Sequence, residues 1–312
     1  MTERRKTLAC IVAVALAALS GCGVGPGEER SGAGVELRVT RDFGHQLVLG
    51  KAGLRIREDE TVMRLLKRNA AVDTRFGGGF VQSIEGVSGR GPGATSDWFY
   101  YVNGIEADRG AADYELSPGD VVQWDRRQWS ETADVRAIVG AFPQPLLDGL
   151  GGKRFPVRVE CQASESAPCR DVKQTLRDAG IPASGSSLGA PGNQNVARVV
   201  VADWSRARAM PTARAIELGP RRSGVFARFT DEGEVLELLG DDGEPVRSEG
   251  SGAGLVAALR PTDEELLWLV TGVDDAGVAA AAAALRPQDL RDAFAVATVG
   301  GRVLKLPLRS QR

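Results

Sequence analysis

The 312-residue sequence predicts an α+β protein in two parts, a small β-rich part with one helix and a larger part that mixes strands and helices. Between residues 35 and 130, short runs of β-branched and aromatic residues are separated by turn sequences, and one segment has helical spacing. From residue 153 to 312, apolar runs of strand length alternate with helical segments. The stretch 131–152 between the two parts, which contains several glycines and prolines, is expected to be a linker.

The first part begins with Val35–Thr40, where apolar and polar residues alternate as in a half-buried strand. Thr61 is a suitable cap for a helix, because the apolar residues that follow it recur at helical spacing. Gly77–Gly79 is expected to be a turn that enters a strand at Phe80. A helix that crosses a small sheet in this order is typical of a β-grasp-like fold.

An aromatic hairpin follows. Trp98–Val102 is rich in aromatic residues and suits a strand, and Asn103-Gly104 supplies the positive φ angles of a two-residue hairpin turn. A second turn at Ser117–Asp120 precedes the strand Val121–Trp124.

The order of these motifs between Glu60 and Trp124 resembles the small β-rich domain that closes transcobalamin and intrinsic factor, which also occurs alone in bacterial surface proteins. The matching motifs are a helix opened by Glu-Thr-Val, a Phe-Val-x-Ser-Ile-x-Gly strand, a Trp-x-Tyr-Tyr-Val-Asn-Gly hairpin and a Pro-Gly-Asp-x-Val turn. The resemblance implies a binding module at residues 35–130. It also raises cobalamin as a ligand, although the helical barrel that holds the other face of cobalamin in those proteins has no counterpart before this domain.

The aromatic hairpin is the candidate ligand-binding site, with Trp98, Tyr100 and Asn103 near its tip. Because side chains alternate along a strand, Phe99 and Tyr101 are expected on the opposite face from Trp98 and Tyr100. One face has to fill the core. The other face is free either to meet a ligand or to pack as well, and the sequence leaves both alternatives open.

The N-terminus has the pattern of a targeting segment. Three basic residues, Arg4–Lys6, precede the apolar run Leu8–Leu19, which is shorter than the roughly 20 residues of a transmembrane helix. Leu19–Cys22 then resembles the lipid-attachment motif of bacterial lipoproteins. This resemblance implies a signal peptide at 1–21, a lipid on Cys22 and an extracytoplasmic protein anchored to the membrane. The alternative is a secretory signal in which Cys22 is incidental. Residues 22–34 are expected to be a flexible tether.

Two cysteines, Cys161 and Cys169, remain for the folded protein. An even pair in an oxidising compartment favours a disulfide, and two free buried thiols are the alternative. A zinc site is not expected, because His45 is the single histidine and lies far away in the sequence. The net charge of −2 and the lack of basic runs with interleaved aromatic residues exclude a typical nucleic-acid surface.

In the second part, a polar loop is expected at Pro182–Asn195, and acidic hairpin turns at Asp231–Gly233 and Asp241–Gly243. Gly185–Gly189 fits the Gly-x-Ser-x-Gly pattern of hydrolases but lacks the strand before and the helix after the serine. The acidic turns lack EF-hand spacing, so solvent-exposed turns explain them better than calcium ligands. The glycine cluster Gly250–Gly254 is not followed by the Lys-Ser/Thr of a phosphate loop.

These patterns together predict an envelope lipoprotein that binds a small ligand, a surface polymer or a protein partner without catalysing a reaction. A corrinoid-binding protein is one alternative. An extracytoplasmic enzyme is the other, and it requires convergent carboxylates with raised pKa in a shared cleft.

The first prediction concerns the membrane attachment. Cys22→Ser should prevent lipid attachment, because the thiol at this position is the acylation point that the motif implies. Detergent partitioning and the intact mass of the protein measure the effect. A variant that still gains the mass of diacylglycerol contradicts the lipoprotein interpretation.

Overall fold

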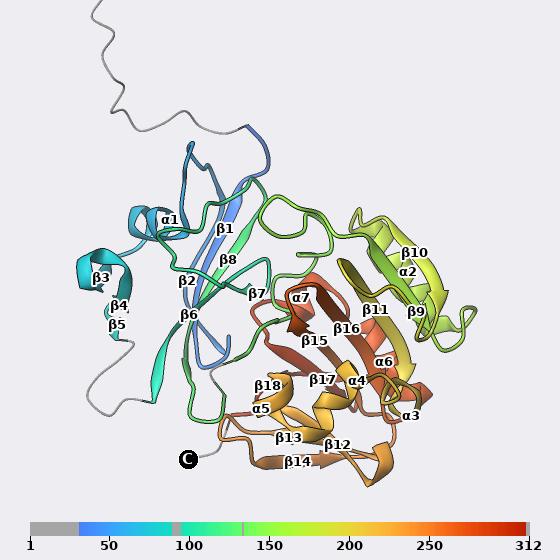
Figure 1. Cartoon of the computed structure of the whole chain (residues 1–312). Coiled ribbons are helices and arrows are strands. Elements are labelled where there is room, and N and C mark those ends of the chain that lie inside the picture. The colour runs from blue at the N-terminus through green and yellow to red at the C-terminus, as the bar shows by residue number, and fades with distance from the viewer. Residues whose placement is uncertain (1–30, 89–94, 133, 310–312) are drawn as a thin grey trace, which may run out of the picture.

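The computed structural model describes residues 31–88, 95–132 and 134–309 and shows a mixed α/β protein with four sheets (Figure 1). The predicted signal peptide, Cys22 and most of the predicted tether lie outside the described residues. Within the described ranges, no helix has the length and apolar character needed to cross a membrane.

The N-terminal sheet has the strand order β2-β1-β8-β6-β7. The two central strands, β1 and β8, are parallel, whereas the other neighbouring strands are antiparallel. The strands are β1 (Val35–Arg41), β2 (Gln46–Leu54), β6 (Ser96–Val102), β7 (Ile105–Glu106) and β8 (Val121–Gln128).

One face of this sheet is covered by α1 (Val62–Asn69) and by a small sheet of β3 (Val72–Arg75), β4 (Phe80–Ile84) and β5 (Val87–Ser88). The hydroxyl of Thr61 caps α1 by accepting a hydrogen bond from Arg64 N at 3.2 Å, as predicted. The turn before β4 is the short 3-10 helix η1 (Phe76–Gly78).

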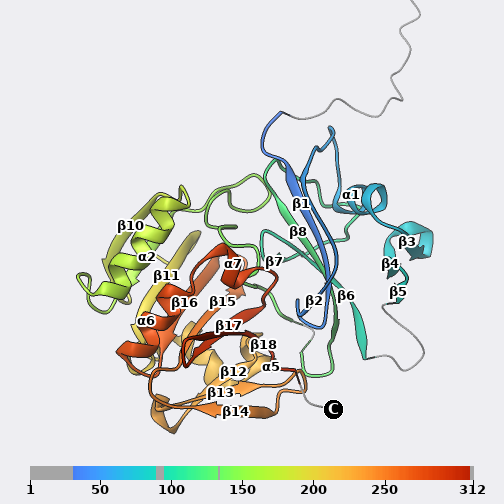
Figure 2. The same ribbon diagram turned by 180° about the vertical axis from the view of Figure 1, so that it is seen from behind.

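The C-terminal sheet has seven strands in the order β10-β9-β11-β16-β15-β17-β18. They are β9 (Val157–Cys161), β10 (Ala183–Ser187), β11 (Val196–Asp203), β15 (Gly254–Thr262), β16 (Glu265–Gly272), β17 (Ala295–Val299) and β18 (Arg302–Leu306). The helices α2 (Ala167–Asp178), α6 (Asp275–Ala283) and α7 (Pro287–Leu290) pack on one face (Figure 2).

The other face of the seven-stranded sheet packs against short helices and a third sheet. These elements are α3 (Trp204–Ala207), α4 (Pro211–Arg214), η2 (Ala215–Leu218), α5 (Pro220–Ser223), β12 (Ala227–Thr230), η3 (Asp231–Gly233), β13 (Val235–Leu239) and β14 (Pro245–Glu249). Because both faces are covered, the central strands are apolar on both sides, and Val199 and Val200 lie in different core clusters.

Two segments differ from the sequence-based expectations. The expected polar loop Pro182–Asn195 contains the edge strand β10, whose small residues carry no strand signal. The expected linker 131–152 packs against the C-terminal sheet. Five of its apolar side chains are at most 5% exposed, namely Val135, Ile138, Val139, Phe142 and Leu146.

The second face of the N-terminal sheet faces the C-terminal part and carries several buried polar side chains beside the aromatic rings of β6. Arg38, on β1, donates from Nη1 to the carbonyl of Gly140 at 3.0 Å and to Asp292 Oδ1 at 3.1 Å. Gln123, on β8, donates to the carbonyl of Asp292 at 3.1 Å. We call Arg38, Gln123, Gly140 and Asp292 the polar seam. These contacts join the two parts of the chain into one packed body.

The expected disulfide is confirmed. Cys161 and Cys169 are bonded and link the end of β9 to the first turn of α2.

The second prediction concerns the polar seam. Arg38→Ala should lower the free energy of unfolding by about 3–5 kcal/mol, because it leaves the carboxylate of Asp292 buried without its guanidinium. The combined change Arg38→Met and Asp292→Asn should cost less than Arg38→Ala alone, since no unpaired charge remains. Urea unfolding of the three proteins measures the difference. Equal losses for the single and the double change contradict this account.

Candidate ligand-binding site

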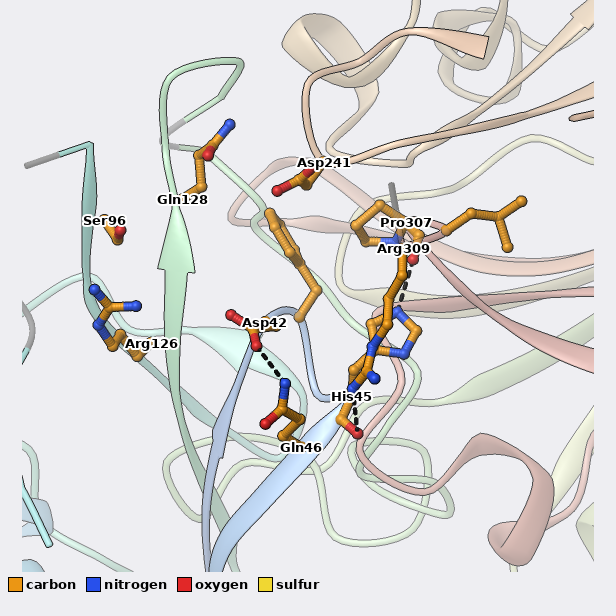
Figure 3. Close-up of a pocket in the computed structure, with 11 residues that line it drawn as sticks. Asp42, His45, Gln46, Ser96, Arg126, Gln128, Asp241, Pro307 and Arg309 are labelled. Atoms are coloured by element: carbon orange, nitrogen blue, oxygen red, sulfur yellow. Dashed lines mark hydrogen bonds between the residues drawn. The ribbon is translucent and has the colours of Figure 1, made fainter. Parts of the chain in front are cut away.

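A pocket of about 310 Å³ opens where the turn between β1 and β2 meets the end of β8 and the chain after β18 (Figure 3). Both parts of the chain therefore contribute to it. Its lining residues are Asp42, Phe43, His45, Gln46, Ser96, Arg126, Gln128, Asp241, Pro307, Leu308 and Arg309.

The floor of the pocket depends on an unusual turn after β1. Asp42, Phe43 and Gly44 have φ angles of 56°, 57° and 77°, a conformation that L side chains rarely adopt. Asp125, fully buried on β8, holds this turn by accepting hydrogen bonds from Phe43 N at 3.0 Å and Gly44 N at 2.8 Å. Its carboxylate also accepts from the hydroxyl of Thr40 at 2.6 Å. The turn directs the Phe43 ring into the core, where it also lines the pocket.

The Phe43 ring is anchored from below by two other aromatic rings. It meets Phe226 with ring centroids 4.9 Å apart and Phe294 at 5.2 Å, both edge to face. Such contacts fix the ring in place. The pocket thus has a rigid apolar floor beneath a polar rim.

His45 joins the pocket to the chain after β18. Its Nε2 lies 2.7 Å from the carbonyl of Pro307, so this nitrogen carries the proton and donates. Arg309 donates in return to the carbonyl of His45 at 3.3 Å, as the dashed lines of Figure 3 show. Burial is the largest influence on His45 and lowers its pKa, which keeps the ring neutral at pH 7.

The rim offers both donors and acceptors. Asp42 and Asp241 supply two negative charges, whereas Arg126 and Arg309 supply two positive charges. Gln128 adds an amide, and its side chain has no hydrogen-bond partner among the residues that the structure describes. With His45 neutral, the pocket carries no net charge, which suits a neutral polar ligand better than an ion.

The residues predicted as a site from the sequence lie elsewhere. Trp98 is 8% exposed and Tyr100 is half-buried, and both pack with the core under α1. Phe99 and Tyr101 lie on the opposite face and pack with the C-terminal part, so the predicted alternation is confirmed. Both faces of the hairpin strand are therefore packed, and the hairpin presents no open aromatic face.

Asn103 is buried and holds the chain in place. Its φ of 54° forms the predicted turn with Gly104. Its amide nitrogen donates to Asp120 Oδ1 and to the carbonyl of Gly149, both at 2.8 Å, and its oxygen accepts from Val121 N at 2.8 Å. These bonds use both donors and one acceptor position of the side chain for structural partners. The hairpin assignment was correct, but its recognition role has no support in this geometry.

A second and larger pocket, of about 530 Å³, lies beyond β7 and contains Glu106. Burial raises the pKa of Glu106 to about 7, although Arg127 Nη2 lies 3.4 Å from its carboxylate and acts in the opposite direction. Asp108, Asp113 and Glu115 line the same pocket. No group of three or more histidine, cysteine or acidic residues in the described ranges has the arrangement of a metal site.

Sequence reasoning missed the first pocket because its residues come from five separate segments. His45 was noted only as an unsuitable zinc ligand, and the turn Asp42–Gly44 was not recognised. One signal was present: Asp-Phe-Gly directly after an alternating strand, which indicates a tight turn beside a buried surface.

Comparisons with known proteins cover only part of the chain. Residues 59–127 match the family described as "Domain of unknown function (DUF4430)". No curated protein matches. One similar solved structure comes from Ruminococcus gnavus ATCC 29149 and is described as "a putative metal binding protein"; it is 13% identical, with 31% of this chain and 98% of that chain covered and a TM-score of 0.25. The matched family residues extend from the segment before α1 to β8, inside the predicted first domain.

The third prediction concerns Trp98. Trp98→Ala should lower the free energy of unfolding by about 3–5 kcal/mol, because it removes a large buried ring from the core under α1. Phe76→Ala is the matched control, since Phe76 is 87% exposed and its loss should change stability by less than about 0.5 kcal/mol. Thermal melts compare the two variants. An unchanged melting temperature for Trp98→Ala contradicts the core assignment.

Proposed function

We propose that this protein is an extracytoplasmic, membrane-anchored binding protein without catalytic activity, which captures a small polar ligand in the pocket above Phe43. The observation that carries this proposal is the composition of the pocket. It has the Phe43 ring as a fixed aromatic floor, a rim of donors and acceptors without net charge, and walls from both parts of the chain. A ligand in this position contacts two sheets that the polar seam already holds together. Little ordering of the protein is needed on binding, which favours affinity.

The chemistry of the rim favours a neutral group with several hydroxyls or amides, such as a sugar unit at the end of a surface polymer. Carboxylate, guanidinium and amide groups in one pocket can pair with the donors and acceptors of such a group at the same time. A cavity of about 310 Å³ is at the small end of the range of ligand sites. This size favours one or two small units over a corrinoid, so cobalamin remains the less favoured alternative.

The finer assignment of the first part as a β-grasp-like domain is also a proposal. It is supported by the strand order β2-β1-β8-β6-β7, by the parallel central pair and by the helix α1 on one face. The extracytoplasmic location is supported by the basic and apolar N-terminal pattern and by the Cys161–Cys169 disulfide, which forms most readily in an oxidising compartment.

The fourth prediction tests the pocket. Ligands released from natively purified protein are identified by mass spectrometry, and the identified compound is then titrated. Gln128→Ala should weaken its binding at least tenfold, because a buried polar group of the ligand loses its partner. Leu218→Ser is the control, since Leu218 is 68% exposed and does not line the pocket. Equal affinity of Gln128→Ala and wild type contradicts the proposed site.

A second candidate function, carboxylate-dependent catalysis, is favoured by one observation. Glu106 combines a raised pKa with a position in the larger pocket beside other carboxylates, which is the arrangement the enzyme alternative requires. Its Arg127 contact and its burial also have a purely structural explanation, since buried acids beside arginines occur in ion-pair networks. A turnover screen with wild type and Glu106→Gln distinguishes the two: turnover that depends on Glu106 replaces the binding proposal with the catalytic one.

The fifth prediction concerns the pH dependence of stability. The pKa of Glu106 is above its ordinary value in the folded protein, so the folded state binds more protons than the unfolded state between about pH 4.5 and pH 7. Stability should therefore fall as pH rises through this window. Glu106→Gln should remove this loss and raise the free energy of unfolding at pH 8 by up to about 3 kcal/mol relative to wild type. Urea unfolding at pH 5 and pH 8 measures it, and parallel pH profiles of the two proteins contradict it.

A further inference from the structure

We propose that the free edge of β10 is a docking site for an extended acidic segment of a partner protein, which adds to the seven-stranded sheet as a further strand. β10 lies at the outer border of this sheet, beside β9 (Figure 1). Addition of a strand to an open sheet edge is a common mode of peptide recognition, in which main-chain hydrogen bonds supply affinity.

Among the described strands, β10 is the one edge that lacks the usual protection against pairing. Its five residues, Ala-Ser-Gly-Ser-Ser, include no charge and no proline, and its register with β9 has no irregularity. Natural edges are normally interrupted by charges, prolines, bulges or very short length. The other edge strands are each protected in one of these ways. Irregular register protects β2, and short length protects β5 and β7, which have two residues each. Charged residues protect the remaining edges, namely β3, β12, β14 and β18.

The register identifies which main-chain groups point outward. Gln162 N donates to the carbonyl of Val201, so the even-numbered residues at the end of β9 pair with β11 and the odd-numbered residues pair with β10. In a parallel pair, the residues of β10 that bond to Val159 are its diagonal neighbours Ser184 and Ser186. The N–H and C=O groups of Ala183 and Gly185 therefore face away from the sheet and are available to a further strand.

The chain after β10 is held rigidly, which keeps the edge in position. Arg158 donates to the carbonyls of Pro191 and Gly192 at 3.0 Å each and to Asn193 Oδ1 at 2.6 Å. Gly189 N donates to Glu160 at 3.1 Å. The edge is thus ordered before a partner arrives, and binding requires little loss of main-chain entropy.

The charge beside the edge selects the kind of partner. Lys173 on α2 lies over β10, since a Cβ added at Gly185 would meet its Nζ at 3.6 Å. Arg170 and Arg177 stand three and four residues away and share this side of the helix. None of the three forms an ion pair with a described residue, although arginine–carboxylate pairs are common elsewhere in the described part of the protein. An added strand with acidic side chains on this face would supply the missing carboxylates.

The same charge disfavours pairing with a second copy of this chain. In a twofold β10–β10 contact, the basic side of α2 would approach its own copy, and like charges at short distance destabilise a complex. The charge beside this edge therefore favours pairing with an acidic strand and disfavours pairing with the β10 strand of a second copy.

The test uses the full chain purified in detergent and a fluorescein-labelled probe, acetyl-Glu-Val-Glu-Thr-Glu-Val-Glu-amide, with a control peptide in which lysine replaces glutamate. Fluorescence anisotropy should show saturable binding of the glutamate peptide below about 1 mM and much weaker binding of the lysine peptide, with affinity that falls as salt rises. The amide of Gly185 should become protected from hydrogen exchange when the glutamate peptide is bound. No binding of the glutamate peptide, or equal binding of both peptides, overturns the proposal.

Two matched variants locate the site. Gly185→Pro removes an outward N–H without touching the bonds to β9, and it should weaken binding at least fivefold. Gly185→Ala keeps the N–H and should bind within twofold of wild type. Lys173→Glu should reverse the preference between the two peptides, and this variant decides the question if Gly185→Pro fails to fold. Unchanged binding by folded Gly185→Pro, an unchanged peptide preference of Lys173→Glu, or a self-association of wild type that Gly185→Pro abolishes overturns the proposal.

Discussion

Asp125 is the residue on which the arrangement of the candidate site depends. It lies fully buried on β8, at the face of the N-terminal sheet that meets the C-terminal part. Its carboxylate fixes the turn after β1 through Phe43 N and Gly44 N, and this turn places Phe43 against Phe226 and Phe294. One carboxylate thereby links the local conformation of a strained turn to the packing between the two parts of the chain. Without it, a turn with three consecutive positive φ angles would lose the two hydrogen bonds that its carboxylate accepts from Phe43 N and Gly44 N.

This linkage has an electrostatic cost. Burial raises the pKa of Asp125 to about 6, even though three hydrogen-bond donors and Arg127 favour its charged form. Arg127 is equally buried and lies 3.7 Å from the centroid of the Phe99 ring. Buried charges of this kind contribute little net stability, but they fix one geometry because other arrangements leave a charge without partners. At this interface, the polar seam and Asp125 determine the relative position of the two sheets, and apolar packing provides the driving force.

The sequence predicted local features well and long-range assembly poorly. The Thr61 cap, the Asn103-Gly104 turn and the Cys161–Cys169 disulfide follow from residue types that act within a few positions, and all three are present. The strand β10 was missed because an edge strand of small residues is stabilised by its neighbour β9 and has little propensity of its own. The pocket was missed for a related reason: Asp42 and Arg309 line one pocket only after the two parts of the chain have packed, and no spacing in the sequence records that arrangement.

The position of the pocket would make the affinity for the proposed ligand and the stability of the fold interdependent. Its walls come from the turn after β1 and from the chain after β18, which are joined by the His45–Pro307 hydrogen bond and by the bond from Lys305 to the carbonyl of Gly44. A ligand that bridges these walls binds only while the two parts remain packed, so it stabilises the packed state in proportion to its concentration relative to its dissociation constant. The β10 edge lies on the opposite border of the seven-stranded sheet from β18. Occupation of the proposed edge would therefore take place far from the pocket walls, and the two proposed surfaces would act independently of each other.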